Sequence, residues 1–258
     1  MNNDLRLKIV EMIRTAGEGH IPSAFSIIDI IAHLYDHVLK VDPSKPDWDE
    51  RDYFILSKGH GCAALYVVLE KHGFITQHDL NTKSKPGGIL GGHPDRTKVP
   101  GAEASTGSLG HGAVTAMGLA LGLRIRGKRN RVFALLGDGE CNEGTIWETA
   151  LVASNLKLGN LCFVVDENGS AAQVLPMTDL SRKWEAFGWE AQDINGHDGK
   201  ELAAAFEDLS FNFTGKPKVI VAHTLKGKGV GFLEGHGAWH YKIPNDTEYA
   251  AIRKELGQ

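Results

Sequence analysis

Two short polar turns, each placed directly after an apolar run, constrain the fold of this 258-residue chain more than any other feature of its sequence. Gly137-Asp138-Gly139 is the first turn, and the second, thirty residues further on, holds Asn168-Gly169. The runs before the turns, residues 131–136 and 161–165, are rich in β-branched and aromatic residues, as buried parallel strands are. Between the turns, residues 145–157 carry apolar side chains near helical spacing. A strand, a helix and a parallel strand are therefore predicted in this order.

The position of the two turns predicts a ligand site. The carboxyl ends of parallel strands meet at one edge of an open α/β sheet, which is where such sheets bind their ligands. Asp138 and Asn168 would present hard oxygen atoms, of the kind that Mg²⁺ or Ca²⁺ takes, and the neighbouring glycines let backbone amides approach a phosphate. Either turn alone would also fit an ordinary tight turn, with Asn168 in a left-handed conformation. Both turns in this setting favour the metal site.

The rest of the chain extends the same fold. Further helices are predicted over residues 4–16, 24–39, 62–72 and 112–126, and further strands over residues 53–56 and 218–223. Gly159 is placed to stop the helix between the two turns. Residues 82–104, rich in Gly, Pro and Lys, predict a long loop, and the Gly-rich residues 227–237 predict a mobile loop that closes over a site. We expect one domain over residues 1–258, an α/β fold with an open, mostly parallel sheet and helices on both faces.

Composition excludes several classes of protein. With 42% hydrophobic residues the chain can bury a substantial core, and its net charge of −4 offers no electrostatic case for nucleic acid. Its three cysteines are too few and too scattered for a disulfide framework or a zinc site. The amino terminus has no apolar signal sequence, and no apolar stretch is long enough to span a bilayer. We therefore expect a soluble, cytoplasmic protein, with neither nucleic acid nor membrane among its partners.

Histidines gather in the predicted loops. Twelve are present, and each of His20, His60, His93, His111 and His240 lies beside glycine or in a predicted loop. Imidazole titrates near neutral pH and acts as hydrogen-bond donor, acceptor or proton shuttle, which suits chemistry on hydroxyl and carbonyl groups. A single loop histidine is more often a solvated or structural side chain. The number of these histidines and the motifs around them are what favour a functional role.

The sequence resembles the thiamine diphosphate superfamily, whose metal and diphosphate motif is a Gly-Asp-Gly turn followed at a similar distance by Asn. More narrowly, it resembles the amino-terminal half of transketolase, from about Gly17 to His240. The blocks that carry this resemblance are Gly17-Glu18-Gly19-His20, Leu56-Ser57-Lys58-Gly59-His60-Gly61, Gly91-Gly92-His93-Pro94, residues 105–112, the two turns, Gly196-His197-Asp198, Lys226-Gly227-Lys228-Gly229 and Trp239-His240. One block alone is weak evidence, but their common order is specific.

The resemblance implies roles for individual residues. The catalytic residues would be His20, His60, His93 and His240, which contact the diphosphate or the sugar, and Glu143, which couples cofactors through protons near the subunit boundary. Thiamine diphosphate would be bound by His60, Gly107, Leu109, Gly110, Gly137, Asp138, Gly139, Asn168, Lys226 and His240. Mg²⁺ or Ca²⁺ would be bound by Asp138, Asn168 and Ser170. Two alternatives stay open: Glu143 also suits a helix N-terminus by its charge, and Lys226 also fits a solvated lysine.

By the same resemblance, the chain would transfer a two-carbon ketol unit from a ketose or ketose phosphate to an aldose acceptor. In the family, the glutamate and aromatic residues that meet the pyrimidine ring belong to a second domain, which we expect on another chain. The expected enzyme is a split transketolase, α₂β₂, in which a carboxyl-terminal transketolase-like subunit supplies the pyrimidine-binding domain. The alternatives are a subunit of another thiamine diphosphate enzyme, of the 2-oxoacid dehydrogenase alpha or deoxyxylulose phosphate synthase type, and a non-catalytic cofactor-binding subunit.

Three positions depart from the family pattern. Glu18 stands where the family has a small hydroxyl residue, and Pro22 stiffens a turn that is normally rich in glycine. His111 stands where relatives often have Gln. We expect these departures to select a donor or acceptor other than the usual pentose phosphates, such as an apiose-derived, sulfonated or amino sugar.

Overall fold

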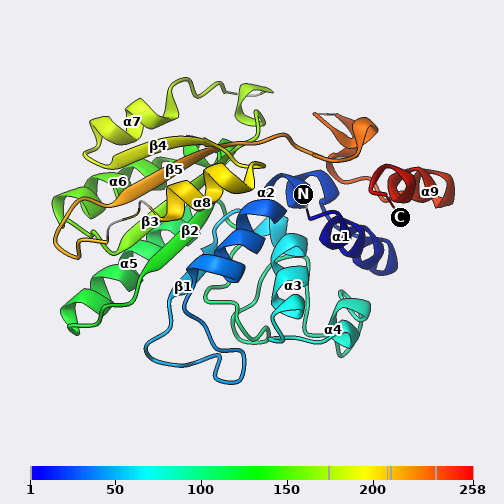
Figure 1. The fold of residues 1–258 in the computed structure, drawn as a ribbon, viewed down its shortest axis with the longest axis horizontal. Coiled ribbons are helices and arrows are strands. Elements are labelled where there is room, and N and C mark those ends of the chain that lie inside the picture. The colour runs from blue at the N-terminus through cyan, green and yellow to red at the C-terminus, as the bar shows by residue number, and fades with distance from the viewer. Residues whose placement is uncertain (1, 174, 208, 210, 236, 258) are drawn as a thin grey trace.

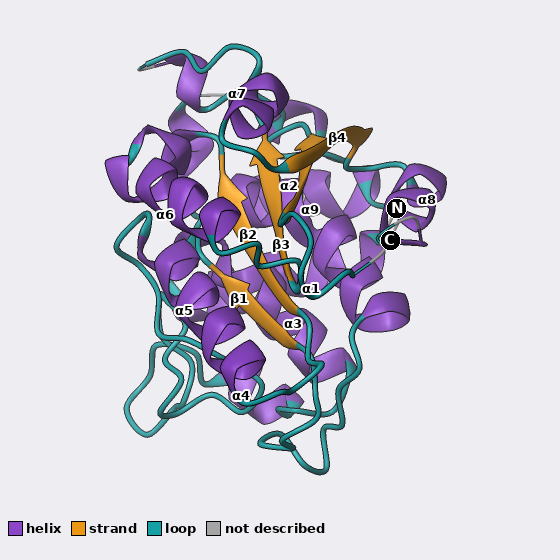
Figure 2. Ribbon diagram, turned by 90° about the vertical axis from the view of Figure 1, so that its left-hand side faces the viewer, coloured by secondary structure: helices purple, strands orange, loops and turns teal. Residues whose placement is uncertain are grey.

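A parallel β-sheet forms the centre of the chain. The computed structural model describes residues 2–173, 175–207, 209, 211–235 and 237–257. Within these residues, the five-stranded sheet has the order β1-β2-β3-β5-β4, with every neighbouring pair parallel (Figures 1 and 2). The strands are β1 (Tyr53–Leu56), β2 (Val132–Gly137), β3 (Leu161–Glu167), β4 (Glu190–Asn195) and β5 (Lys218–His223). The predicted open, parallel α/β sheet is confirmed.

Helices cover both faces of this sheet (Figure 1). The described helices are α1 (Asn3–Ala16), α2 (Ile21–His33), α3 (Cys62–Lys71), α4 (Gln77–Asn81), α5 (His111–Ile125), α6 (Gly144–Asn155), α7 (Leu180–Ala186), α8 (Gly199–Glu207) and α9 (Asp246–Glu255). One core contains α1, α2, α3 and α8, and the other contains α5, α6 and α7. None of the helices in the described part of the chain has the length and apolar character needed to cross a lipid bilayer.

The continuous apolar runs follow from this two-sided burial. Successive side chains of a strand point to opposite faces of a sheet. In β2, Phe133 and Leu135 enter the core that contains α2 and α3, whereas Val132, Ala134 and Leu136 enter the core that contains α5 and α6. Because both faces are covered, the strand shows no alternation of polar and apolar residues, and each large side chain contributes about 2 kcal/mol through its burial.

The predicted elements agree with the observed ones to within a few residues at most ends, but two boundaries are corrected. The helix predicted over 24–39 begins earlier, at Ile21, because Pro22 is well suited to the first turn of a helix. Its last turn, Leu34–Val38, is a π-helix. The helix between the two turns ends at Asn155, so Gly159 is not its stop. Gly159 instead lies against the carbonyl of Asn212, where a Cβ would come within 1.7 Å of the oxygen.

Several observed elements were not predicted: α4, α7, β4, α8 and α9. β4 shows why, since it lies at the edge of the sheet and Ile194 is its only buried residue, so it has no apolar run. Residues 82–104 form no helix or strand, as predicted. The described residues of 227–237 include a short helical turn, Gly231–Leu233. The mobility expected of this segment stays a prediction.

Candidate functional site

The carboxyl ends of four parallel strands surround a small cavity. The residues that follow β1, β2, β3 and β5 line a space of about 170 Å³, together with Ser23 of α2. Most of the site residues predicted from the sequence line it, namely His60, Leu109, Gly137, Asp138, Gly139, Asn168, Ser170, Lys226 and His240. The prediction that the two turns meet at one edge of the sheet is confirmed, because Gly137 pairs with Asp166 in the register of β2 and β3.

Asp138 and Asn168 are both buried at this cavity. Asp138 accepts hydrogen bonds from the backbone amides of Gly139 (2.7 Å) and Ala171 (3.1 Å). Asn168 accepts one from the amide of Ser170 (3.0 Å). The alternative in which Asn168 is the left-handed residue of a turn is wrong, since Gly169 takes that conformation, with φ 80°.

The surroundings of Asp138 fit a cation. Burial raises the pKa of its carboxyl group, and among the described residues no basic side chain forms an ion pair with it. A buried carboxylate without a paired cation is costly, and a bound divalent ion would remove that cost. The oxygens of Asp138, Asn168 and Ser170 are the donor type that Mg²⁺ and Ca²⁺ prefer. In the described part of the chain, no three His, Cys, Asp or Glu side chains form a metal-binding group, so a phosphate and water would have to complete the coordination.

The two glycines of the first turn leave room for a ligand. A Cβ added at Gly139 would meet no atom within 4 Å, and one added at Gly137 would approach the stem of Lys58 at 3.7 Å. Neither glycine has a positive φ angle, so backbone freedom does not explain them. Absence of a side chain keeps the cavity open and its backbone accessible.

Three of the predicted histidines form one cluster. The ring of His20 lies 5.5 Å from that of His60 and 5.3 Å from that of His240, between centroids. Burial lowers the pKa of His20 to about 4, helped by His240, and the pKa of His60 to about 2, helped by the Lys58 ammonium. Both imidazoles are therefore neutral at pH 7.

Five predicted residues do not line the cavity, namely His20, His93, Gly107, Gly110 and Glu143. His93 is exposed and packs against Gly107, where a Cβ would lie 3.2 Å from its ring. Gly110 has φ 83° and donates its amide to the buried carboxylate of Glu140 (2.8 Å). Glu143 is exposed at the N-cap position of α6 and makes no capping hydrogen bond with its side chain. Its charge nevertheless lies at the helix N-terminus, as the alternative reading of this residue expects.

Three residues with no predicted role, Ser23, Lys58 and Glu140, also line the cavity. Lys58 forms a buried ion pair with Asp166 (2.5 Å). Glu140 accepts hydrogen bonds from Ser57 Oγ (2.5 Å), and from the amides of Gly110 and Gly137. Lys58 and Glu140 could have been predicted as site residues, because each is a charged residue beside glycine just after a predicted strand.

Each of the three departures from the family pattern has a defined environment. Ser84 and the buried Lys83 (3.3 Å) both donate hydrogen bonds to the carboxylate of Glu18, and these contacts, that of Ser84 first, lower its pKa. Pro22 accepts a hydrogen bond from the amide of Gly227 (3.1 Å), which ties α2 to the segment of Lys226. His111 is exposed and does not line the cavity.

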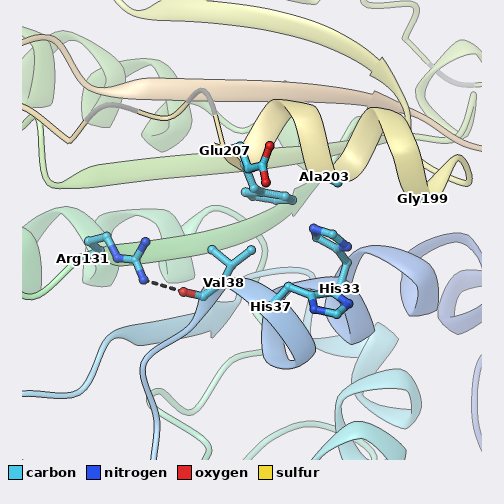
Figure 3. Close-up of a pocket in the computed structure, with 8 residues that line it drawn as sticks. His33, His37, Val38, Arg131, Gly199, Ala203 and Glu207 are labelled. Atoms are coloured by element: carbon cyan, nitrogen blue, oxygen red, sulfur yellow. Dashed lines mark hydrogen bonds between the residues drawn. The ribbon is translucent and has the colours of Figure 1, made fainter.

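A second, larger cavity, of about 500 Å³, lies between α8 and the end of α2 (Figure 3). His33, the last residue of α2, and His37 of the π-helical turn that follows face α8 across it, and Arg131 lies just before β2. Arg131 is already paired with Asp52 (2.5 Å) and donates to the carbonyl of Val38. No predicted site residue lines this larger cavity, so the chemistry gathers in the smaller one.

Comparison with known proteins gives a consistent result. The whole chain, residues 1–258, matches the family model described as transketolase, thiamine diphosphate binding domain. It is 35% identical to one of the subunits of the apulose-4-phosphate transketolase of Phocaeicola vulgatus, over 98% of this chain and 91% of that one. It is 39% identical to 6-deoxy-6-sulfo-D-fructose transketolase subunit SqwG of Clostridium sp., over 97% of this chain and 93% of that protein.

The solved structures that it resembles are of longer chains. The transketolase of Leishmania mexicana superposes with a TM-score of 0.91 at 29% identity, over 99% of this chain and 40% of that one. The transketolase of Campylobacter jejuni gives the same TM-score and identity, over 99% of this chain and 42% of that one. The chain thus spans about two fifths of these transketolases.

Proposed function

Since the chain belongs to the transketolase family, through its thiamine diphosphate-binding domain, we propose that it is the amino-terminal subunit of a split transketolase. The enzyme transfers a two-carbon ketol unit from a ketose donor to an aldose acceptor. The observation that carries the proposal is the cavity where Asp138, Asn168, His60 and Lys226 meet at the ends of parallel strands. The similarity to two subunits of split enzymes over more than nine tenths of their length supports it. The alternative thiamine diphosphate enzymes and the non-catalytic subunit are not favoured by the names of these relatives.

The cavity is suited to the diphosphate end of the cofactor and one divalent cation. Asp138, Asn168 and Ser170 would bind Mg²⁺ or Ca²⁺, while Lys226 offsets phosphate charge. Lys226 donates to Ser170 Oγ (3.3 Å) and to Nδ1 of His240 (3.0 Å), so its ammonium is held at the cavity. When bound, thiamine diphosphate supplies a thiazolium that stabilises a carbanion.

The histidines would act on the sugar. Neutral imidazoles at His20 and His60 accept or donate hydrogen bonds without adding charge, so they suit the orientation of hydroxyl groups and short proton transfers. His93 and His240 complete this set. The backbone of Gly107, Leu109 and Gly110 would meet the pyrimidine end of the cofactor, and the hydrogen bond to Glu140 holds Gly110 in place.

A partner chain follows from the proposal. We place the pyrimidine-binding domain on a carboxyl-terminal transketolase-like chain, in an α₂β₂ assembly, and the exposed Glu143 at the boundary with it. The names of the relatives, which call them subunits, support a partner, and the apulose and sulfofructose in those names support a substrate other than the usual pentose phosphates. A cytoplasmic location is part of the proposal, supported by three buried, free cysteines.

Reconstitution tests this function. The purified chain is mixed with a candidate partner from the neighbouring gene, thiamine diphosphate and Mg²⁺, and consumption of a panel of ketoses is measured with an aldehyde acceptor. We expect ketol transfer by the mixture and none by either chain alone. The Asp138→Ala chain, mixed with the same partner, is expected to be inactive. Full activity of the single chain would contradict the split arrangement.

A further inference from the structure

The carboxylate of Asp166 is fully buried beside the cavity and accepts hydrogen bonds from four side chains. Its Oδ2 accepts from Lys58 Nζ (2.5 Å), Ser26 Oγ (2.8 Å) and Asn168 Nδ2 (2.7 Å). Its Oδ1 accepts from Thr224 Oγ1. These donors belong to α2 and to the segments that follow β1, β3 and β5. One carboxylate therefore joins most of the elements that form the cavity.

The contact with Asn168 determines which way its carboxamide faces. An amide side chain offers an oxygen on one side and an NH₂ group on the other. A carboxylate accepts hydrogen bonds and cannot donate them, so the NH₂ group of Asn168 must face Asp166. The oxygen Oδ1 then lies on the opposite side, where it accepts the amide of Ser170 and keeps a second lone pair. The backbone carbonyl of Asp166 also accepts the amide of Asp138 (3.1 Å), so one residue contacts both proposed ligands of the cation.

Lys58 keeps this carboxylate in place. The side chains of Lys58 and Asp166 are 2% and 0% exposed, so the pair is shielded from water. A buried ion pair of this kind is a poor source of stability but fixes geometry, because each charge needs the other. Asp166 has acceptor capacity for all four donors, and an amide in its place would not.

We propose that Asp166 is a positioning residue for the divalent cation, which holds the carboxamide oxygen of Asn168 toward Asp138. The inference rests on the proposed function, because it assumes that Asp138 and Asn168 bind a cation. Its specific consequence is that residue 168 must be a hydrogen-bond donor toward Asp166 as well as an oxygen ligand.

The test uses Mn²⁺ as the probe, on the full chain mixed with its partner and thiamine diphosphate, and measures free Mn²⁺ by electron paramagnetic resonance. Asn168→Asp keeps an oxygen at the same place and adds charge, so a residue that is only a ligand would bind Mn²⁺ as tightly or more tightly. We expect affinity to fall at least about tenfold, because two carboxylates would then face each other without a proton between them.

The reciprocal double variant Asp166→Asn/Asn168→Asp restores a donor opposite an acceptor, with the net charge of the wild type. We expect it to recover part of the lost affinity, because the NH₂ group of residue 166 would then also face Lys58, which donates to the same oxygen in the wild type. Ser26→Ala is the matched control, since it removes a donor to the same oxygen of Asp166 and leaves Asn168 untouched. It is expected to bind Mn²⁺ within about threefold of the wild type. Circular dichroism on each variant checks folding, and Asp166→Asn replaces Asn168→Asp should the latter not fold.

The outcomes separate this inference from the function on which it rests. A wild-type chain that binds no Mn²⁺, like Asp138→Ala, would overturn the proposed function together with the inference. Mn²⁺ binding by the wild type, with equal or tighter binding by Asn168→Asp, would overturn the inference alone.

Discussion

The ammonium of Lys226 donates a hydrogen bond to Nδ1 of His240, 3.0 Å away, and so joins two residues of the cavity that are fourteen positions apart in the chain. Lys226 is buried, whereas Lys228, two residues further on, is partly exposed and lies 3.8 Å from Glu234. This removes the solvated-lysine alternative for Lys226. The lysine of this Gly-rich segment that faces the cavity is the one that the family resemblance assigned to the cofactor.

Replacement of this lysine is expected to weaken cofactor binding. Lys226→Met removes a positive charge next to the proposed phosphate site, so the affinity for thiamine diphosphate should fall about tenfold or more. Quenching of tryptophan fluorescence during titration with thiamine diphosphate and Mg²⁺ measures it. Lys228→Met is the matched control and should bind as the wild type does. An equal loss of thiamine diphosphate affinity in both variants would show an effect of net charge and would contradict a specific contact between Lys226 and the diphosphate.

The affinity for the cation should depend on pH through Asp138. A cation binds the deprotonated carboxylate, and burial raises the pKa of Asp138. Mn²⁺ affinity should therefore decline as the pH falls, beginning above the usual range of an aspartate, by up to about tenfold per pH unit. Titration of the chain with Mn²⁺ between pH 7 and pH 4 checks this. An affinity that stays constant over this range would argue against a cation bound by this carboxylate.

The stability of the unliganded chain should depend on pH through His20. Its pKa is lowered to about 4 in the folded chain, whereas an unfolded histidine titrates near 6.5. Between these values the unfolded chain binds more protons, so this histidine makes the free energy of unfolding decrease as the pH falls from 6.5 to 4. In His20→Gln, the free energy of unfolding, measured by urea unfolding, should depend less on pH, by up to the equivalent of one proton per chain. His78→Gln, at an exposed position of α4 outside the cavity, serves as the control.

Glu18 is expected to influence the choice of sugar. Hydrogen bonds from Ser84 and Lys83 lower the pKa of its carboxyl group, and His93 lies close enough to contribute to that lowering. Glu18→Ser should change the ratio of kcat/KM between the preferred donor and xylulose phosphate about tenfold in the reconstituted enzyme. Glu18→Gln keeps the size of the side chain and removes its charge, so it separates the effect of charge from the effect of size. An equal loss for both donors would show that Glu18 serves stability alone.

Much of the cavity could be predicted because its signals are local. Asp138 and Asn168 follow apolar runs, and a strand followed by a polar, glycine-rich turn is recognisable from neighbouring residues. Edge strand β4 and the short helix α7 were not predicted, because few of their residues are buried and so neither has a clear apolar pattern. The prediction that Gly159 ends a helix was wrong because glycine often follows the last residue of a helix, whereas Gly159 allows the backbone of Asn212 to pack against it.

By itself, the sequence determined the parallel sheet, the edge at which ligands bind and the two polar turns, since each depends on burial patterns within one segment. The other predicted residues that line the cavity, His60, Leu109, Ser170, Lys226 and His240, followed from the resemblance to the transketolase family. Only the tertiary structure decided which polar groups meet. Lys58 and Asp166 are 108 residues apart in the chain, and Glu18 and Lys83 are 65 apart. The two residues of each pair nevertheless form an ion pair, and the lysine of each pair is buried. Lysine is normally exposed, so no local pattern predicts its burial. The carboxylates that reach these two lysines come from distant segments that folding alone brings together.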